Sequence, residues 1–275
     1  MRGITTNNAI YGIDDFTIAY AGNFTIAGAL AYPGKQCGEF RAIAESIDGN
    51  GEPPLEATLP GPGAYSIHNA LPARKYRVSA YRDTDGDGVC DFWEPQGEWA
   101  QNPLGPVMGD AAGIDIDLID PGSPSGIPYW WWRQYFGSLT RAQMDGRYPD
   151  PASADAVLSL SDGDSSSLIM VDLSQADPDR DGMNNFGEYV SGTDPLDAQS
   201  VLILKGIDRI ADGLVRLEWY SATDRFYSVW RSSEFGGVSD LLKTSITGSP
   251  PVNLYLDTSA TGFGPYFYRV QVETE

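Results

Sequence analysis

Two segments of the chain space oxygen-bearing side chains in the same way. The first is residues 83–94 (DTDGDGVCDFWE) and the second is residues 177–188 (DPDRDGMNNFGE). Both fit the pattern D-x-[DN]-x-[DN]-G-x5-E, in which loop positions 1, 3, 5, 7, 9 and 12 supply oxygen ligands and the glycine at position 6 allows a sharp turn. One match alone is compatible with a solvated acidic turn. Two full matches, each with the glycine and the terminal glutamate, indicate two cation sites.

The ligand chemistry of both loops favours calcium. Hard oxygen donors in a flexible loop select Ca²⁺ over zinc, and over magnesium, which prefers a rigid octahedron with waters. Crowded carboxylates also repel one another until a cation neutralises them. The predicted ligands of the first loop are Asp83, Asp85, Asp87, the Val89 carbonyl group, Asp91 (directly or through water) and Glu94. Those of the second loop are Asp177, Asp179, Asp181, the Met183 carbonyl group, Asn185 and Glu188.

The remaining chemistry-bearing residues do not make a catalytic set. The single histidine, His68, follows Ile67 on a predicted strand and is expected to be an ordinary surface residue. Paired aspartates at residues 14–15 and 162–164 lie in turn-rich sequence, where the two carboxylates of a glycoside hydrolase are not expected. No nucleophile, base and orienting group come together in the pattern. We therefore expect a protein that is not an enzyme.

Three consecutive tryptophans, Trp130, Trp131 and Trp132, have two interpretations. At helical spacing at least one of them must face inward to bury a short helix, which favours packing between domains. The alternative is an exposed platform on which sugar rings stack. The sequence leaves both open.

The composition limits the class of partner. The chain of 275 residues contains 18 Lys and Arg against 38 Asp and Glu, a net charge of −20. Nucleic acid and anionic membrane surfaces both require clustered basic residues, so neither is an expected partner. No apolar run approaches the 18 residues of a membrane-spanning helix, so no membrane insertion is expected. The 31 glycines and 19 prolines indicate many turns and short strands.

Short strands are predicted on both sides of a central, less regular region. Alternating or apolar runs lie at residues 24–32, 40–44, 63–67, 75–82 and 114–118, and again at 201–204, 214–219, 226–230, 253–256 and 266–272. A Pro- and Gly-rich linker covers residues 120–128, a short helix is predicted over residues 129–136, and another over 184–190. Neither aspartate-rich loop lies between two helices, so both are expected to be structural clips and not calcium sensors.

This pattern predicts a mostly β fold with two antiparallel β-sandwich-like domains, joined by a short helix and a calcium-binding loop region. The expected divisions are an N-terminal arm or extra strand (1–22), a sandwich with the first calcium loop (23–120), a linker with the Trp-rich helix and second loop (121–199), and a small β-domain (200–275).

The N-terminal arm has its own strand-like alternation, with Phe16, Ile18 and Tyr20 on one face. The residues Gly22-Asn23 suit a two-residue turn, which favours a hairpin of residues 15–21 with 24–32. The alternative is that the arm adds a strand to the sheet of another copy, which can build a filament.

The two cysteines, Cys37 and Cys90, both belong to the expected N-terminal sandwich. A disulfide between them closes a loop of about 50 residues and stabilises by up to about 4 kcal/mol in the chain-entropy model. We expect this bridge; the alternative is two buried free thiols.

Several segments resemble known secreted modules. Residues 177–195 (DPDRDGMNNFGEYVSGTDP) resemble the dockerin or thrombospondin type 3 calcium repeat of secreted bacterial proteins, and residues 127–137 (IPYWWWRQYFG) resemble the short Trp-containing helix that often precedes it. The segments RFYSVWRSSEFGG and PYFYRVQV resemble the small β-domain that follows such repeats. The segments IAGALAY, GAYSIHNALPARKYRVSAYRDTDGDG and GIDIDLIDP resemble a prealbumin-like, carboxypeptidase-regulatory-type β-sandwich.

These resemblances cover most of residues 24–275, and the chain departs from them in Cys90, at a loop position usually apolar, and in the N-terminal arm. They imply an exported, bacterial, non-catalytic multidomain protein at the cell surface or outside the cell. We expect a calcium-stabilised structural protein that self-assembles as a surface or fibre subunit. The alternative is a carbohydrate-binding accessory region of an exported glycan-active system, with a cell-surface glycan as its partner.

Overall fold

The computed structural model describes residues 24–273 apart from residues 50, 138, 146–171, 212, 238 and 262. The N-terminal arm, with its expected hairpin, and the aspartates at 14–15 and 162–164 lie outside the described residues. The chain divides into two compact units, residues 1–120 and residues 121–275. The division falls where the Pro- and Gly-rich segment begins.

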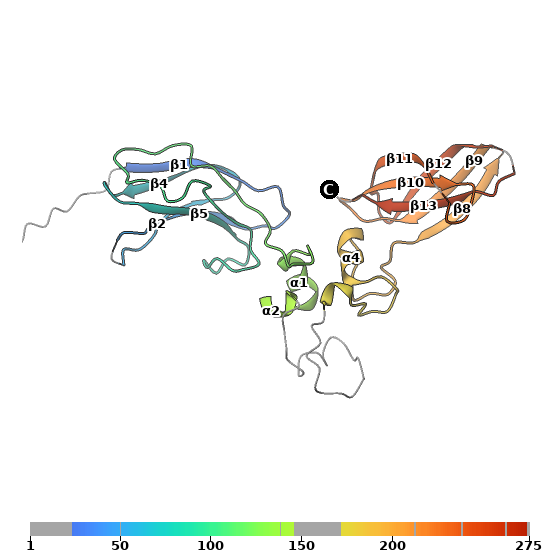
Figure 1. Cartoon of the computed structure of the whole chain (residues 1–275), viewed down its shortest axis with the longest axis horizontal. Coiled ribbons are helices and arrows are strands. Elements are labelled where there is room, and N and C mark those ends of the chain that lie inside the picture. Colours follow the sequence, from blue (N-terminus) through green and yellow to red (C-terminus); the bar gives the residue numbers. More distant parts are fainter. Residues whose placement is uncertain are drawn as a thin grey trace, which may run out of the picture. The chain divides into compact units, whose positions relative to one another are not determined.

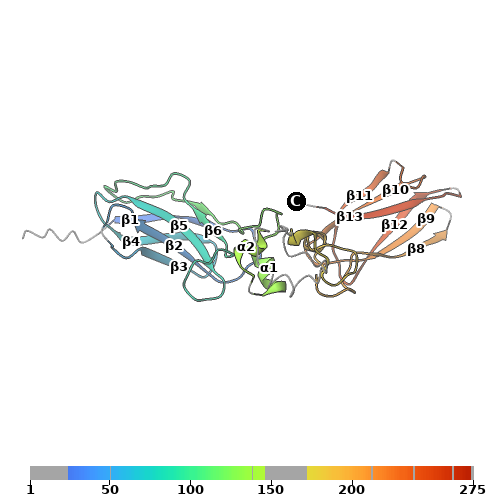
Figure 2. The same ribbon diagram turned by 60° about the horizontal axis from the view of Figure 1, so that its bottom comes forward.

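The first unit is a sandwich of two small sheets (Figures 1 and 2). Its strands are β1 (Phe24–Ala31), β2 (Glu39–Ser46), β3 (Leu55–Leu59), β4 (Gly63–Ala70), β5 (Tyr76–Asp83), β6 (Gln96–Glu98) and β7 (Ile116–Asp117). One sheet has the order β4-β1-β7 and the other has the order β3-β2-β5-β6. All of these pairs are antiparallel except β1 with β7.

Alternation along the strands gives the first unit a closed core. Fifteen buried apolar side chains from both sheets form one cluster, and Ile26, Phe40, Ile67 and Val78 within it are fully buried. The Tyr65 hydroxyl donates a hydrogen bond of 2.6 Å to the carbonyl oxygen of Ile114, so the one polar group of this side chain has a partner.

Both edges of β1 are paired. On one side β4 pairs with it from Phe24 to Leu30. On the other side the Ala27 N–H donates to the carbonyl oxygen of Ala111 at 2.8 Å, and the Leu118 N–H donates to that of Ala31 at 2.8 Å. A hairpin partner for residues 24–32 needs a free edge, and β1 offers none within its own unit.

The second unit begins with short helices. They are α1 (Tyr129–Phe136), α2 (Arg141–Met144), the 3₁₀ helix η1 (Leu173–Gln175) and α4 (Asn185–Ser191). Helix α1 has the predicted bounds and ends at Gly137, whose φ of 67° is a conformation that favours glycine. None of the helices in the described part of the chain combines the length and apolar character needed to cross a membrane.

Helix α1 buries two of its three tryptophans. Trp131 and Trp132 are 4% and 1% exposed, and their rings meet edge to face at 5.2 Å. Trp131 also contacts the Tyr189 ring of α4 at 6.1 Å. At least one tryptophan was expected to face inward, and two do. Neither of these two buried side chains offers a surface on which a sugar could stack.

A second sandwich completes the second unit. Its strands are β8 (Leu204–Ala211), β9 (Gly213–Tyr220), β10 (Phe226–Ser232), β11 (Asp240–Thr247), β12 (Val252–Ala260) and β13 (Phe267–Val272). The sheets have the orders β12-β9-β8 and β11-β10-β13, with antiparallel pairs throughout. Buried Asp257 on β12 accepts hydrogen bonds from Arg231 at 2.7 Å and from the Tyr268 hydroxyl at 2.8 Å. This network links β12 to β10 and β13.

The mostly β fold predicted from the sequence is confirmed, and three strands were not predicted. These are β3, β6 and β11. The strand expected at residues 201–204 lies further along the chain. It is β8, which begins at Leu204 and pairs with β9.

The expected disulfide was wrong. Cys37 and Cys90 are both free and both exposed, so neither the bridge nor a pair of buried thiols is found. Cys90 lies inside the first aspartate-rich loop, next to Val89, whose N–H donates to Asp87, and its thiol is exposed.

Candidate metal centres

The first aspartate-rich loop follows directly from β5, whose last residue is Asp83. The Asp83 carboxylate is 3% exposed and accepts backbone hydrogen bonds from Gly86 at 2.9 Å and Gly88 at 3.1 Å. Both glycines have a φ of 79°. At Gly88, position 6 of the pattern, this positive φ is the conformation for which the pattern requires glycine.

The second loop reproduces these contacts in a different setting, between η1 and α4. Asp177 accepts from the N–H of Arg180 at 2.7 Å and of Gly182 at 3.0 Å, at the same offsets as in the first loop. Two further bonds are also shared. In the first loop, the Asp87 N–H donates to Asp85 at 3.3 Å and the Val89 N–H donates to Asp87 at 2.7 Å. In the second loop, the corresponding bonds run from the Asp181 N–H to Asp179 at 3.3 Å and from the Met183 N–H to Asp181 at 2.7 Å. Four hydrogen bonds at equivalent positions thus give the two loops the same backbone conformation.

This shared loop conformation brings most of the predicted carboxylates close together. Carboxylate oxygens lie within 4.8 Å of one another in three groups, namely Asp83 with Asp85 and Glu94, Asp85 with Asp87 and Asp91, and Asp177 with Asp179 and Asp181. Each group can hold a metal ion. The predicted ligands Val89 and Met183 follow these aspartates in the chain, and their N–H groups bond back to Asp87 and Asp181.

The twelfth residue of each loop is fully buried, but its contacts differ. The carboxylate of Glu94 accepts from the N–H of Thr84 at 2.6 Å and from that of Asp91 at 3.1 Å. Neither oxygen of Glu188 has a hydrogen-bond partner, and the same is true of the buried Oδ2 atoms of Asp179 and Asp181. An unpartnered buried carboxylate is costly, so the second loop has the stronger need for a positive charge.

The pKa values of Glu188 and Glu94 reflect this difference in hydrogen bonding. Burial, together with repulsion from Asp179 and Asp181, raises the pKa of Glu188 to about 8, although the Thr193 side chain acts in the opposite direction. Burial also raises the pKa of Glu94, but the N–H groups of Asp91 and Thr84 act in the opposite direction. A cation in the second loop would relieve both causes at Glu188.

Asn185 starts α4 and joins the second loop to η1. Its Nδ2 donates to the carbonyl oxygen of Leu173 at 2.7 Å, while its buried Oδ1 has no hydrogen-bond partner. The preceding residue, Asn184, caps the helix by accepting from the Gly187 N–H at 2.8 Å. The helix therefore begins inside the loop and places Glu188 one turn later.

Two arginines contribute to the loops and were not found by sequence reasoning. Arg41 on β2 donates through Nε to Asp83 Oδ2 at 3.0 Å, so the first loop already contains one positive group. Arg225 donates to the carbonyl oxygens of Tyr189 at 2.8 Å and Val190 at 2.7 Å, at the end of α4. Both contacts depend on residues far apart in the sequence, and no spacing signal points to them.

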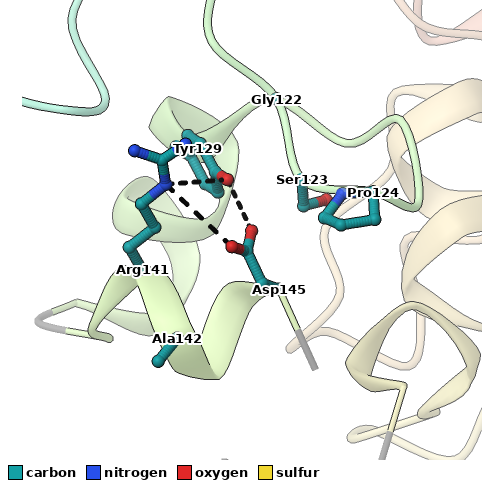
Figure 3. Close-up of a pocket in the computed structure, with 7 residues that line it drawn as sticks. All are labelled: Gly122, Ser123, Pro124, Tyr129, Arg141, Ala142 and Asp145. Carbon is teal, nitrogen blue, oxygen red and sulfur yellow. Dashed lines mark hydrogen bonds and ion pairs between the residues drawn. The ribbon is translucent and has the colours of Figure 1, made fainter. Parts of the chain in front are cut away.

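A separate pocket of about 620 Å³ lies beside α1 and α2 (Figure 3). Its polar groups bond to one another, because the Tyr129 hydroxyl donates to Asp145 at 2.5 Å and Arg141 Nε donates to Tyr129 at 3.3 Å. The Ser123 hydroxyl donates to the carbonyl oxygen of Ile127 at 3.0 Å. The bonds of Tyr129 connect α1 with α2 and Asp145, and that of Ser123 closes the turn before α1, so the group is explained by structure without a ligand. The predicted surface histidine, His68, is exposed on β4.

No protein-family model matches the chain, and no curated protein matches its sequence. The two loops are accordingly interpreted from their own geometry. An all-oxygen donor set, a backbone conformation shared by both loops and the unpartnered buried carboxylates of the second loop fit a hard divalent cation better than zinc or a redox metal.

Proposed function

We propose that the protein is a non-catalytic, calcium-stabilised extracellular structural protein that self-assembles as a surface or fibre subunit. The observation that carries the calcium part is the set of four hydrogen bonds shared by the two loops, together with the unpartnered carboxylate of Glu188. The first loop follows strand β5, and the second is entered from η1, a 3₁₀ helix of only three residues, so in neither case do two long helices flank the cation, which acts as a clip that fixes a loop. The resemblance of residues 177–195 to secreted calcium repeats supports the extracellular location.

Calcium titration by calorimetry tests the proposal. We expect two sites with affinities of about 10⁻⁴ to 10⁻³ M, typical of extracellular modules. Asp83→Asn and Asp177→Asn should each remove one site, because each replaces a charged first ligand by an isosteric neutral one. Asp208→Asn is the matched control, since Asp208 lies on β8 in an exposed ion pair with Arg216. Retention of both sites in Asp83→Asn and Asp177→Asn would contradict calcium binding by these loops.

Chelation provides a second test. At about 10 mM calcium, affinities in this range stabilise each site by roughly 1.4–2.7 kcal/mol, which corresponds to several degrees in the melting temperature. Chelator should lower the melting temperature and open residues 83–94 and 177–195 to proteases. Unchanged melting and unchanged protease resistance would be evidence against calcium clips.

Light scattering in calcium tests self-assembly. Full-length protein should form particles whose size grows with concentration, and deletion of residues 1–20, which removes Phe16, Ile18 and Tyr20, should leave monomers. Equal assembly of the truncated chain would remove the arm from the proposal.

The second candidate function is carbohydrate binding. The burial of Trp131 and Trp132 argues against the platform suggested by the sequence, but Phe235 is 89% exposed and its ring lies 5.6 Å from that of Phe267. Titration with common polysaccharides tests this candidate, and Phe235→Ala should abolish any affinity that depends on this aromatic pair.

A further inference from the structure

Strand β13 has an open edge. It is the last strand in the order β11-β10-β13 (Figure 1), and β10 is its one partner among the strands of the described residues. An unpaired edge presents a row of backbone donors and acceptors that a strand from another chain can bind.

The core beneath β13 is also incompletely covered. Val229 and Tyr227 on β10 are fully buried, whereas Val270, which pairs with Val229, is only partly buried. Among the described residues, the cluster of this sandwich has five buried apolar side chains against fifteen in the first unit, and each cluster has eight partly buried ones packed against it. The free edge of β4 differs, because its inward residues Tyr65 and Ile67 are already buried. An added strand beside β13 would therefore bury apolar surface as well as pair the edge.

The chain supplies a segment with the pattern of such a strand. Phe16, Ile18 and Tyr20 alternate with small or polar residues. This segment cannot pair with β1, because both edges of β1 are occupied between Thr25 and Ala31. An apolar alternating face needs a sheet edge with an open core, and β13 has both properties.

Charge favours the same pairing. The segment is preceded by two aspartates at residues 14–15, and residues 24–120 contain six Lys and Arg against fifteen Asp and Glu. Residues 200–275 contain seven against nine, so the second sandwich repels an acidic segment far less than the first does. β13 itself has no acidic residue, and its Arg269 is exposed with its guanidinium 5.2 Å from the Trp230 ring.

We propose that the outer edge of β13 binds residues 16–20 of a second copy of this chain as an added strand. Phe16, Ile18 and Tyr20 then cover the open core beside Val270. This inference rests on the proposed self-assembly and names its acceptor surface. Donor and acceptor lie on different units of one chain, so each bound copy keeps a free donor or acceptor and the contact extends head to tail.

Disulfide trapping between two variants tests the acceptor. In full-length protein with Cys37→Ser and Cys90→Ser, one copy carries Ala19→Cys and the other carries Gln271→Cys, both outward-facing positions by alternation. The copies are mixed in calcium and oxidised, and crosslinked peptides are identified by mass spectrometry. Thr58→Cys on the exposed edge of β3 is the matched control acceptor.

The proposal predicts a crosslink between residues 19 and 271 at least tenfold more abundant than that between 19 and 58. Assembly without the 19–271 crosslink, or with preferential crosslinking to 58, would overturn β13 as acceptor while leaving self-assembly intact. If the parent protein stays monomeric at high concentration, self-assembly itself fails. A crosslink within one chain that carries both cysteines, formed at high dilution, would overturn the second copy as the donor.

A charge placed on the donor face gives an independent readout. Ile18→Asp should reduce the assembled fraction at least tenfold, because it puts a carboxylate over the core of the acceptor. Ile47→Asp, at an exposed isoleucine of the first unit, is the control and should assemble as the parent does. Equal assembly of Ile18→Asp and the parent would contradict the proposed face.

Discussion

The two cation loops have one backbone course but different needs for a cation. Each first aspartate accepts two backbone N–H groups, which fix the same turn at the start of both loops. The last glutamate of the first loop is held by two N–H groups, and that of the second loop is buried without any. The cost of unpartnered buried carboxylate oxygens therefore falls on the second loop, on both oxygens of Glu188 and on the Oδ2 atoms of Asp179 and Asp181.

Glu188→Gln should change the free energy of unfolding in opposite directions with and without calcium. In chelator, the neutral amide removes a buried carboxylate crowded by Asp179 and Asp181, and we expect stabilisation by about 1–3 kcal/mol. In calcium, the variant loses a charged ligand and should be less stable than the parent. Glu94→Gln is the control and should gain less in chelator, because Glu94 already has two donors. Denaturant titrations in both buffers measure the change, and the same sign in both would contradict it.

The cysteines give a second prediction at this scale. Both thiols are free and exposed, so an alkylating reagent should modify Cys37 and Cys90 in native, unreduced protein. Mass spectrometry should show two additions. A native mass two hydrogens lighter and resistant to alkylation would instead establish the bridge that the structure lacks.

At the level of elements, local sequence patterns identified the strands that alternate and missed those that do not. The strands β1, β5 and β9 carry clear alternation, and α1 has its predicted bounds. β3 contains Glu56 and Ala57, which have little strand preference, and β6 has three residues, so both depend on pairing with β2 and β5. Such pairing is a tertiary effect that local patterns do not contain.

In the candidate metal centres, too, the sequence predicted contacts within a loop but not contacts that depend on tertiary structure. Loop spacing predicted the carboxylates that lie within 4.8 Å of one another, because the ligands lie within twelve consecutive residues, but Glu188 is not in the group formed by Asp177, Asp179 and Asp181. It did not predict that Arg41 would reach Asp83, since this contact depends on the register of β2 with β5. Nor did it predict the contacts of Arg225, which lies 37 residues after Glu188 in the sequence. Arg225 donates to two carbonyl oxygens at the end of α4, the helix that carries Glu188.

Arg225 connects the second loop to the second sandwich. Arg225→Met removes both hydrogen bonds to the carbonyl groups of Tyr189 and Val190, so we expect destabilisation by about 1–3 kcal/mol and faster amide exchange in α4. Arg216→Met removes solvent-accessible ion pairs and should destabilise the protein less than Arg225→Met does. Urea denaturation and hydrogen exchange measure both variants. An Arg225→Met protein as stable as Arg216→Met would show that this link contributes little.

At the level of the whole molecule, the excess of acidic residues is unevenly distributed. Nine of the 38 acidic residues lie in the two loops, and the second sandwich is close to neutral. The net charge of −20 therefore opposes folding through two effects of different range. One is local crowding inside the loops, which a bound cation removes. The other is long-range repulsion between exposed charges, which dissolved salt screens.

These two effects predict different responses to sodium and calcium. In chelator at low salt, about 0.1 M NaCl shortens the screening length to about 10 Å and should raise the melting temperature slightly. It cannot reach the buried carboxylate of Glu188, so most of the loss caused by chelation should remain. Calcium at equal ionic strength should restore it, and Asp83→Asn/Asp177→Asn should respond to calcium no more than to sodium. Differential scanning calorimetry across matched salt series measures these shifts. Full recovery in sodium chloride alone would mean that calcium acts by screening and not by occupying the loops.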